Sequence, residues 1–229
     1  MATNESRVEL RKIKVVEVKI RIYGDSPLIM HAWSAKAKKE MLDKQMGKSK
    51  TKKKEPKNPT FDFVESIYWL DKKPTITQDM SVEESEKVLA EFMQNENPRF
   101  GFPATAFKKA AVASGYRMGM TKDKVSALGS FFIHGEASAV NSDLEMVEIH
   151  SDAPRLREDM VRITGTTDIR YRGEFRNWYA DLTISYNENG NYSIEDIINM
   201  INAGGYACGV GEWRPEKSGN YGMFHVAEE

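Results

Sequence analysis

The segment 155–176 combines two side-chain types that suit contact with a nucleic-acid strand. Arginine binds phosphate oxygens through two parallel hydrogen bonds, and aromatic rings stack on unpaired bases. The arginines are Arg155, Arg157, Arg162, Arg170, Arg172 and Arg176. The aromatic residues in the segment and directly after it are Tyr171, Phe175, Trp178 and Tyr179. The pattern favours binding of a single strand. A structural role is the alternative, since Glu158, Asp159, Asp168, Glu174 and Asp181 could pair with the arginines.

A second unusual stretch is the glycine-rich loop over 209–222. Glycine lets the backbone adopt positive φ or approach a ligand closely. The residues expected to act here are Gly209, Gly211, Trp213, Arg214, Lys217, Gly219 and Gly222. They supply backbone access, a stacking ring and two cations. The alternative is the tip of a β-hairpin whose tryptophan covers a sheet.

Residues 47–59 form a lysine-rich segment with six lysines, one glutamate and two prolines. It has no apolar side chain to bury, so we expect a mobile loop. Lys52, Lys53 and Lys54 are its candidates for phosphate contact, and a solvated insertion is the alternative.

Metal and catalytic signals are weak. His31, His134, His150, His225 and Cys208 show no ligand spacing, and the chain has neither a G-x-S-x-G motif nor a P-loop. We therefore predict no metal site, no cofactor and no catalytic residue. Asp25 and His31 flank the end of the first predicted strand, and a metal-dependent nuclease is the alternative they leave open.

Bulk composition indicates a globular chain able to bury a core. The 229 residues include 33 Lys plus Arg and 34 Asp plus Glu, so the net charge of −1 neither favours nor excludes nucleic acid. A single cysteine requires no oxidising compartment, and no apolar run reaches the ~20 residues of a membrane span. We expect a cytoplasmic protein without membrane contact.

Periodicity then predicts the elements that position these residues. Strands are expected over 13–23, 131–138, 146–150 and 178–186, with an arginine-rich hairpin over 155–176. Helices are expected after Ser81, from Pro103, and from Ser193 to a stop at Gly204-Gly205. The chain should end in a strand interrupted by the glycine-rich loop. This order predicts one α+β domain over 1–229, an elaborated ferredoxin-like or RRM-like β-α-β-β-α-β core with a helical insertion.

Three motifs resemble the RAMP superfamily, the RRM-like backbone subunits of CRISPR effector complexes. They are SPLIMH after the first strand, FPATAFKKAAV at the start of a helix, and the final G-x-G…G-x-Y-G loop. The resemblance implies that Lys108 and Lys109 face phosphates and that the glycines form the RAMP loop. The chain departs from the pattern at Ala104-Thr105-Ala106 and at Trp213-Arg214-Pro215.

Nearly the whole chain also resembles a group of uncharacterised tailed-phage and prophage proteins. The shared patterns are LIMHxxSxKAKKEMLxKQ, GFPAxAFKKA, REDMVR and GVGEWRPEKxGxxGxF. This resemblance implies a phage origin and no particular activity.

Our hypothesis is a phage-encoded, RAMP-like protein that binds single-stranded RNA or DNA and assembles as a homo-oligomer along it. Base stacking would come from Trp33, Tyr171, Trp178 or Trp213. An anti-defence or other protein-interaction module is the main alternative, with a host or phage protein as partner. The nuclease is a further one.

Overall fold

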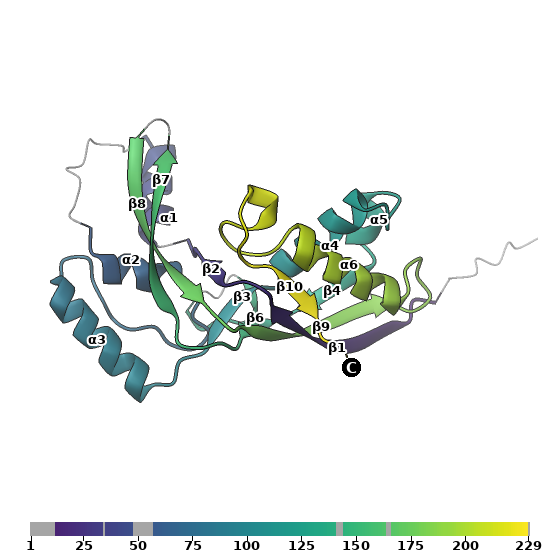
Figure 1. Cartoon of the computed structure of the whole chain (residues 1–229), viewed down its shortest axis with the longest axis horizontal. Coiled ribbons are helices and arrows are strands. Elements are labelled where there is room, and N and C mark those ends of the chain that lie inside the picture. Colours follow the sequence, from purple (N-terminus) through teal and green to yellow (C-terminus); the bar gives the residue numbers. More distant parts are fainter. Residues whose placement is uncertain (1–11, 34, 48–56, 141–143, 164–165, 229) are drawn as a thin grey trace, which may run out of the picture.

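The structure, a computed structural model, describes residues 12–33, 35–47, 57–140, 144–163 and 166–228. A four-stranded sheet carries helices on one face, and a long β-hairpin projects to one side (Figure 1). Most of the predicted lysine-rich loop lies outside the described residues, and Lys52, Lys53 and Lys54 lie there with it. The assignment of 1–229 to a single domain stays a prediction.

The central sheet has the strand order β10-β1-β9-β4, and each pair of neighbours is antiparallel. Its strands are β1 (Val15–Gly24), β4 (Phe131–His134), β9 (Tyr179–Asn187) and β10 (Phe224–Val226). The alternation predicted for the first strand is confirmed. Val16, Val18, Ile20 and Ile22 pack on the core, whereas the side chains between them are exposed.

Two helices, α4 (Ala104–Arg117) and α6 (Ile194–Ala207), cover one face of this sheet (Figure 1). Ser193 begins α6 through a capping box with Asp196, as its sequence indicates. The predicted stop at Gly204-Gly205 is wrong. A Cβ atom on Gly204 would lie 2.7 Å from the backbone nitrogen of Ala111 in α4, so this glycine allows close packing of the two helices.

The end of the chain also differs from the prediction. Helix α6 continues to Ala207, where a strand was expected, because its inner face packs on α4 and β10. An irregular loop follows, and it includes the short 3-10 helix Pro215–Lys217. The final strand is therefore confined to β10.

The predicted arginine-rich hairpin is confirmed as β7 (Arg155–Ile163) and β8 (Thr166–Phe175). The short strand β2 (Leu28–Met30) pairs with β8 and continues this sheet. A third small sheet contains β3 (Phe100–Pro103), β6 (Glu145–Ile149) and β5 (Glu136–Ala137). The remaining helices are α1 (Ala35–Gln45), α2 (Pro59–Ser66), α3 (Val82–Asn95) and α5 (Lys124–Leu128).

Aromatic side chains fill the core between these elements. Trp69, Phe107, Phe131, Trp178 and Phe224 are among its largest fully buried members. Trp178 is 1% exposed, and its Nε1 donates to the Ser26 carbonyl at 2.8 Å, so its predicted role in base stacking is wrong. The α+β class is confirmed by the mixture of helices and antiparallel sheets.

Candidate nucleic-acid interface

A groove of about 610 Å³ runs between α4 and the loop that follows α6. Its walls combine residues far apart in the sequence. Apolar and aromatic groups from Tyr68, Phe102 and Val210 line it together with the small side chains of Ala106, Ala110 and Ala113 on α4. Its charged residues are Lys109, Lys124, Arg214, Glu212 and Glu216. The groove therefore offers an apolar lining with cations beside it.

Helix α4 presents its first turn to the groove. Pro103 is the N-cap residue and supplies no side-chain hydrogen bond to the first turn. Pro103, Thr105 and Ala106 all line the groove, so the first turn of the helix borders it. Helix propensity is supported here by a run of alanines, and the fixed φ of proline allows the turn from β3 into α4.

Arg214 is held in the groove wall by two acceptors. Its guanidinium donates to the Gly211 carbonyl at 2.9 Å and to the Glu216 carboxylate at 2.9 Å. Glu216 also accepts from Arg117 at 3.0 Å. Burial alone would raise the pKa of Glu216, but the two arginines hold it below its usual value. The Glu216 carboxylate is thus shared by two arginines, so the net charge of these three side chains is positive.

The glycines of the loop serve mainly the packing of the loop on the protein itself. Gly209, Gly211 and Gly222 have positive φ, as glycine permits. A Cβ atom on Gly211 would lie 2.5 Å from the Ile29 carbonyl oxygen. A Cβ atom on Gly219 would overlap the Trp213 carbonyl. Gly209 and Gly211 line the groove, whereas Gly219 and Gly222 are not among its lining residues.

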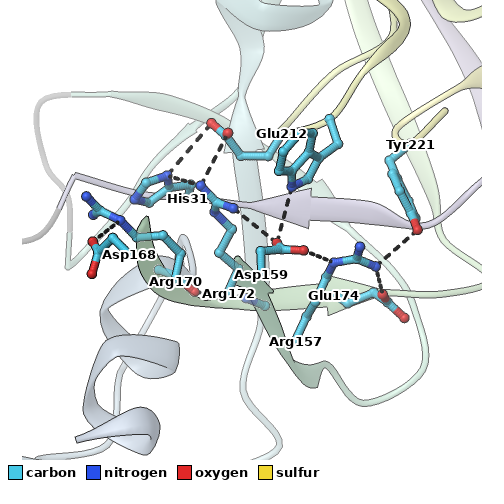
Figure 2. A network of polar contacts seen from close by, with 12 residues as sticks. His31, Arg157, Asp159, Asp168, Arg170, Arg172, Glu174, Glu212 and Tyr221 are labelled. Atoms are coloured by element: carbon cyan, nitrogen blue, oxygen red, sulfur yellow. Dashed lines mark hydrogen bonds and ion pairs between the residues drawn. The ribbon is translucent and has the colours of Figure 1, made fainter. Parts of the chain in front are cut away.

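A buried network joins the hairpin to this loop (Figure 2). Asp159 on β7 accepts hydrogen bonds from Arg157 at 2.8 Å, from Arg172 at 3.0 Å and from the Trp213 indole at 3.2 Å. The side chains of Arg172 and Asp159 are 6% and 7% exposed. Three donors from two separate segments therefore satisfy one buried carboxylate, which fixes the loop on the hairpin.

The network continues on both sides of Asp159. Arg157 donates to Glu174 at 2.9 Å and to the Tyr221 hydroxyl at 3.2 Å, and it also lies over the Tyr221 ring (Figure 2). On the other side, Glu212 lies 3.6 Å from Arg172 and 3.8 Å from His31. The His31 interaction and the Arg172 charge lower the pKa of Glu212, although burial opposes them. Glu212 and His31 also line the groove, so the network reaches its wall.

The structure thus corrects the phosphate-binding role predicted for part of the hairpin. Arg172 is buried among carboxylates, and Arg176 donates to Glu174 at 2.6 Å. Arg170 lies 3.0 Å from Asp168, which also pairs with Lys57. The structural alternative holds for Arg172, because its side chain is buried. Arg170 and Arg176 are paired with carboxylates but remain partly exposed, and their phosphate-binding role stays a prediction. Arg162 is exposed near the hairpin turn, where its predicted role stays a prediction.

The two adjacent lysines of α4, Lys108 and Lys109, lie on different surfaces of the protein. Lys109 lines the groove, and the phosphate contact that the resemblance implies for it stays a prediction. Lys108 lies with its Nζ 4.1 Å from the ring centroid of Phe132 on β4, and burial lowers its pKa. Among the remaining predicted residues, Trp213 is partly exposed and Lys217 is exposed on the 3-10 helix. Lys109, Gly209, Gly211 and Arg214 are therefore the predicted residues that the groove brings together.

Sequence reasoning missed several lining residues of the groove. Tyr68, Lys124 and Glu212 come from three distant segments, and no local motif marks them.

Asp25 pairs with His225 at 2.6 Å, whereas His31 belongs to the network at the groove. Within the described residues, no three His, Cys, Asp or Glu side chains gather in a way that could hold a metal. Burial raises the pKa of the Cys208 thiol, which lines the groove.

No protein-family model and no curated protein matches the sequence. Among solved structures, Cmr6 from Pyrococcus furiosus is similar in fold. The match covers 94% of this chain and 100% of that chain, with 9% identity and a TM-score of 0.41.

Within the described residues, no helix is both long and apolar enough to cross a bilayer.

Proposed function

We propose that this protein binds single-stranded nucleic acid in the groove between α4 and the loop after α6. The observation that carries the proposal is the convergence of Lys109, Lys124, Arg214 and the first turn of α4 on one apolar groove. Cations and a helix N-terminus bind phosphate, and an apolar lining accepts unpaired bases.

The ferredoxin-like core is part of the same proposal. In chain order, β1, α4, β4, β9, α6 and β10 follow the β-α-β-β-α-β succession expected from the sequence. The strand order β10-β1-β9-β4 places the first and third of these strands side by side in the centre. On this assignment, the hairpin and the elements α1 to α3 are insertions into the core.

We further propose that copies of the chain assemble side by side along the bound strand. Exposed apolar side chains support this assembly. Met160 on the hairpin is 76% exposed, and Leu156 and Ile169 lie exposed on the same hairpin. Met41 and Leu42 are exposed on α1. Such side chains favour contact with another protein surface, and we assign a second copy of the chain as that partner. The phage origin and the RAMP-like role in such an assembly complete the proposal.

Fluorescence anisotropy with labelled single-stranded RNA and DNA, measured across a salt series, tests the groove. Lys109→Glu should weaken binding and reduce the slope of log affinity against log salt by about 1. Lys87→Glu is the matched control, because Lys87 is exposed on α3 outside the groove. Equal effects of both substitutions, or no binding by the wild type at low salt, would contradict the proposal. Addition of Mg²⁺ to the same samples tests the nuclease alternative, since cleavage would show as a loss of anisotropy.

A further inference from the structure

The second face of the central sheet, opposite α4 and α6, is open to solvent (Figure 1). Alternate residues of β1, including Glu17, Lys19, Arg21 and Tyr23, are exposed on it. The register places Tyr179 of β9 beside Tyr23, and His225 of β10 beside Tyr23 on the other side. This face is separate from the groove, because none of these residues lines the groove.

Four rings form a continuous row across this face. The Tyr23 ring centroid lies 6.0 Å from that of His225 and 6.1 Å from that of Tyr179. His150 is joined to Tyr179 by a β-bridge, and its ring stacks on the tyrosine with centroids 4.6 Å apart and planes 19° apart. The row thus connects β10, β1, β9 and the residue that follows β6.

Polar contacts fix the orientation of the His225 and Tyr179 rings in the unliganded protein. The His225 Nδ1 atom lies 2.6 Å from an Asp25 carboxylate oxygen. Arg21 donates two hydrogen bonds to Asp181, at 2.7 and 2.8 Å, and its guanidinium lies 4.7 Å from the centre of the Tyr179 ring. Rings fixed in this way lose little conformational freedom when a ligand stacks on them. Tyr23 nevertheless keeps 41% of its surface exposed.

The β4 edge of the same face adds a ring and a cation. Phe132 is an exposed ring on β4, and Lys108 of α4 reaches over it. Phe132 pairs in register with Ser185, and His134, two residues further along β4, has its Nε2 2.6 Å from the Ser185 hydroxyl. Exposed rings thus lie at both sides of the face, and Lys19 lies on the strand between them. Lys108, which the resemblance implies faces phosphates, lies at this surface.

We propose that the open sheet face is a second contact surface for single-stranded nucleic acid, on which unpaired bases stack at the exposed rings of the row, above all Tyr23, while Tyr179 is held between His150 and Arg21 and joins the row together. The inference rests on the proposed function, in that the chain binds single strands. Every nucleobase has a π-face, so such a row accepts bases without reading sequence. Tyrosine and histidine rings and the exposed Lys19 on the same strand as Tyr23 suit a polar, anionic strand, whereas Arg21 is paired with Asp181.

The test compares a normal single-stranded oligonucleotide with an abasic strand of equal length and charge. The variants are Tyr23→Ala, which removes a ring, and Tyr23→Phe, which keeps it. Tyr23→Ala should weaken binding of the normal strand by about fivefold to a hundredfold and leave binding of the abasic strand unchanged. Tyr23→Phe should bind both strands as the wild type does. Thermal unfolding by circular dichroism verifies that the variants are folded.

Several outcomes separate this inference from the proposed function. If Lys109→Glu weakens binding but Tyr23→Ala does not, the groove binds the strand and the stacking surface is refuted. A loss of equal size on normal and abasic strands would also refute it, because the loss would not involve bases. A change of oligomeric state caused by Tyr23→Ala would assign the face to a second copy of the chain and overturn the inference. A wild type that binds no strand would overturn both proposals.

Discussion

The Arg172 guanidinium and the Asp159 carboxylate lie 3.0 Å apart across neighbouring strands of the hairpin, and both side chains are almost fully buried. This pair gives Arg172 a structural role in the arginine-rich hairpin. A buried arginine that neutralises a buried carboxylate stabilises the fold and is not accessible to phosphate. The Trp213 indole donates to the same carboxylate, so the pair also anchors the loop that forms one wall of the groove.

Arg172→Ala should lower the free energy of unfolding by about 3–5 kcal/mol, because it leaves the Asp159 charge buried with fewer donors. Arg162→Ala on the exposed part of the same hairpin should change it by less than about 0.5 kcal/mol. Urea denaturation monitored by circular dichroism measures both values. Similar small effects of the two substitutions would show that Arg172 is not a structural residue.

Gly211→Ala should destabilise the protein and weaken strand binding together. Its φ of +81° and the 2.5 Å approach of a Cβ atom to the Ile29 carbonyl oxygen both oppose a side chain. Gly47 provides a matched control, since its φ is +69° and a Cβ atom there would meet nothing within 4 Å. Gly47→Ala should cost only the roughly 1–2 kcal/mol of a left-handed backbone. Equal losses of unfolding free energy in the two variants would contradict the packing role of Gly211.

Stability should fall in mild acid. Burial alone would raise the pKa of Glu174, but the hydrogen bonds from Arg157 and Arg176 lower it. The interaction with His31 and the charge of Arg172 lower the pKa of Glu212. A carboxylate whose pKa is lower in the folded protein stabilises it above the unfolded value of about 4.3, and this stabilisation is lost as the pH falls through the folded value. Urea denaturation from pH 7 to pH 3 should therefore show a decline that begins near pH 5.

Glu212→Gln gives the matched comparison for this decline. The amide does not titrate, so the variant should be less stable than the wild type at pH 7 and should lose less stability on acidification. An unfolding free energy that is constant or rises towards pH 3 would contradict the assignment.

Assembly on a strand should depend on the exposed hairpin. Met160→Glu places a charge at an apolar contact and should leave the protein monomeric on a long oligonucleotide, where the wild type forms larger particles. Light scattering coupled to size exclusion measures the mass. Met118→Glu, at an exposed methionine after α4, is the control and should assemble normally. Assembly of Met160→Glu at the wild-type mass would exclude the hairpin from the contact.

Helix caps and strand alternation, which depend only on neighbouring residues, were sufficient to predict several helices and strands. Ser81 and Ser193 begin helices through their own side chains, and the alternation of 13–23 and 178–186 marks two strands of the central sheet. The arginine-rich hairpin was also predictable from its turn and alternation. Lys109, Gly209, Gly211 and Arg214 were predicted from motifs, and the structure brings them together at the groove.

Relationships set by tertiary packing could not be read from the sequence. Asp159 and Trp213 are 54 positions apart, and only the folded chain shows that the carboxylate accepts from the indole. Gly204 and Gly205 look like a helix stop, yet close packing on α4 keeps them helical. Trp178 looks like a stacking ring among arginines, but its place in the strand pattern directs it into the core. Burial thus excludes direct strand contact for Trp178 and Arg172, whose residue types alone suggested it.

The most direct measurement of strand binding in the groove is photocrosslinking of the wild-type protein to a single-stranded oligonucleotide that carries a photoreactive base, with crosslinked peptides identified by mass spectrometry. The proposal predicts crosslinked peptides that contain the lining residues, Tyr68 and Phe102 on one side and Val210 on the other. Bound strands that crosslink elsewhere, and never to peptides of the groove, would contradict the proposal.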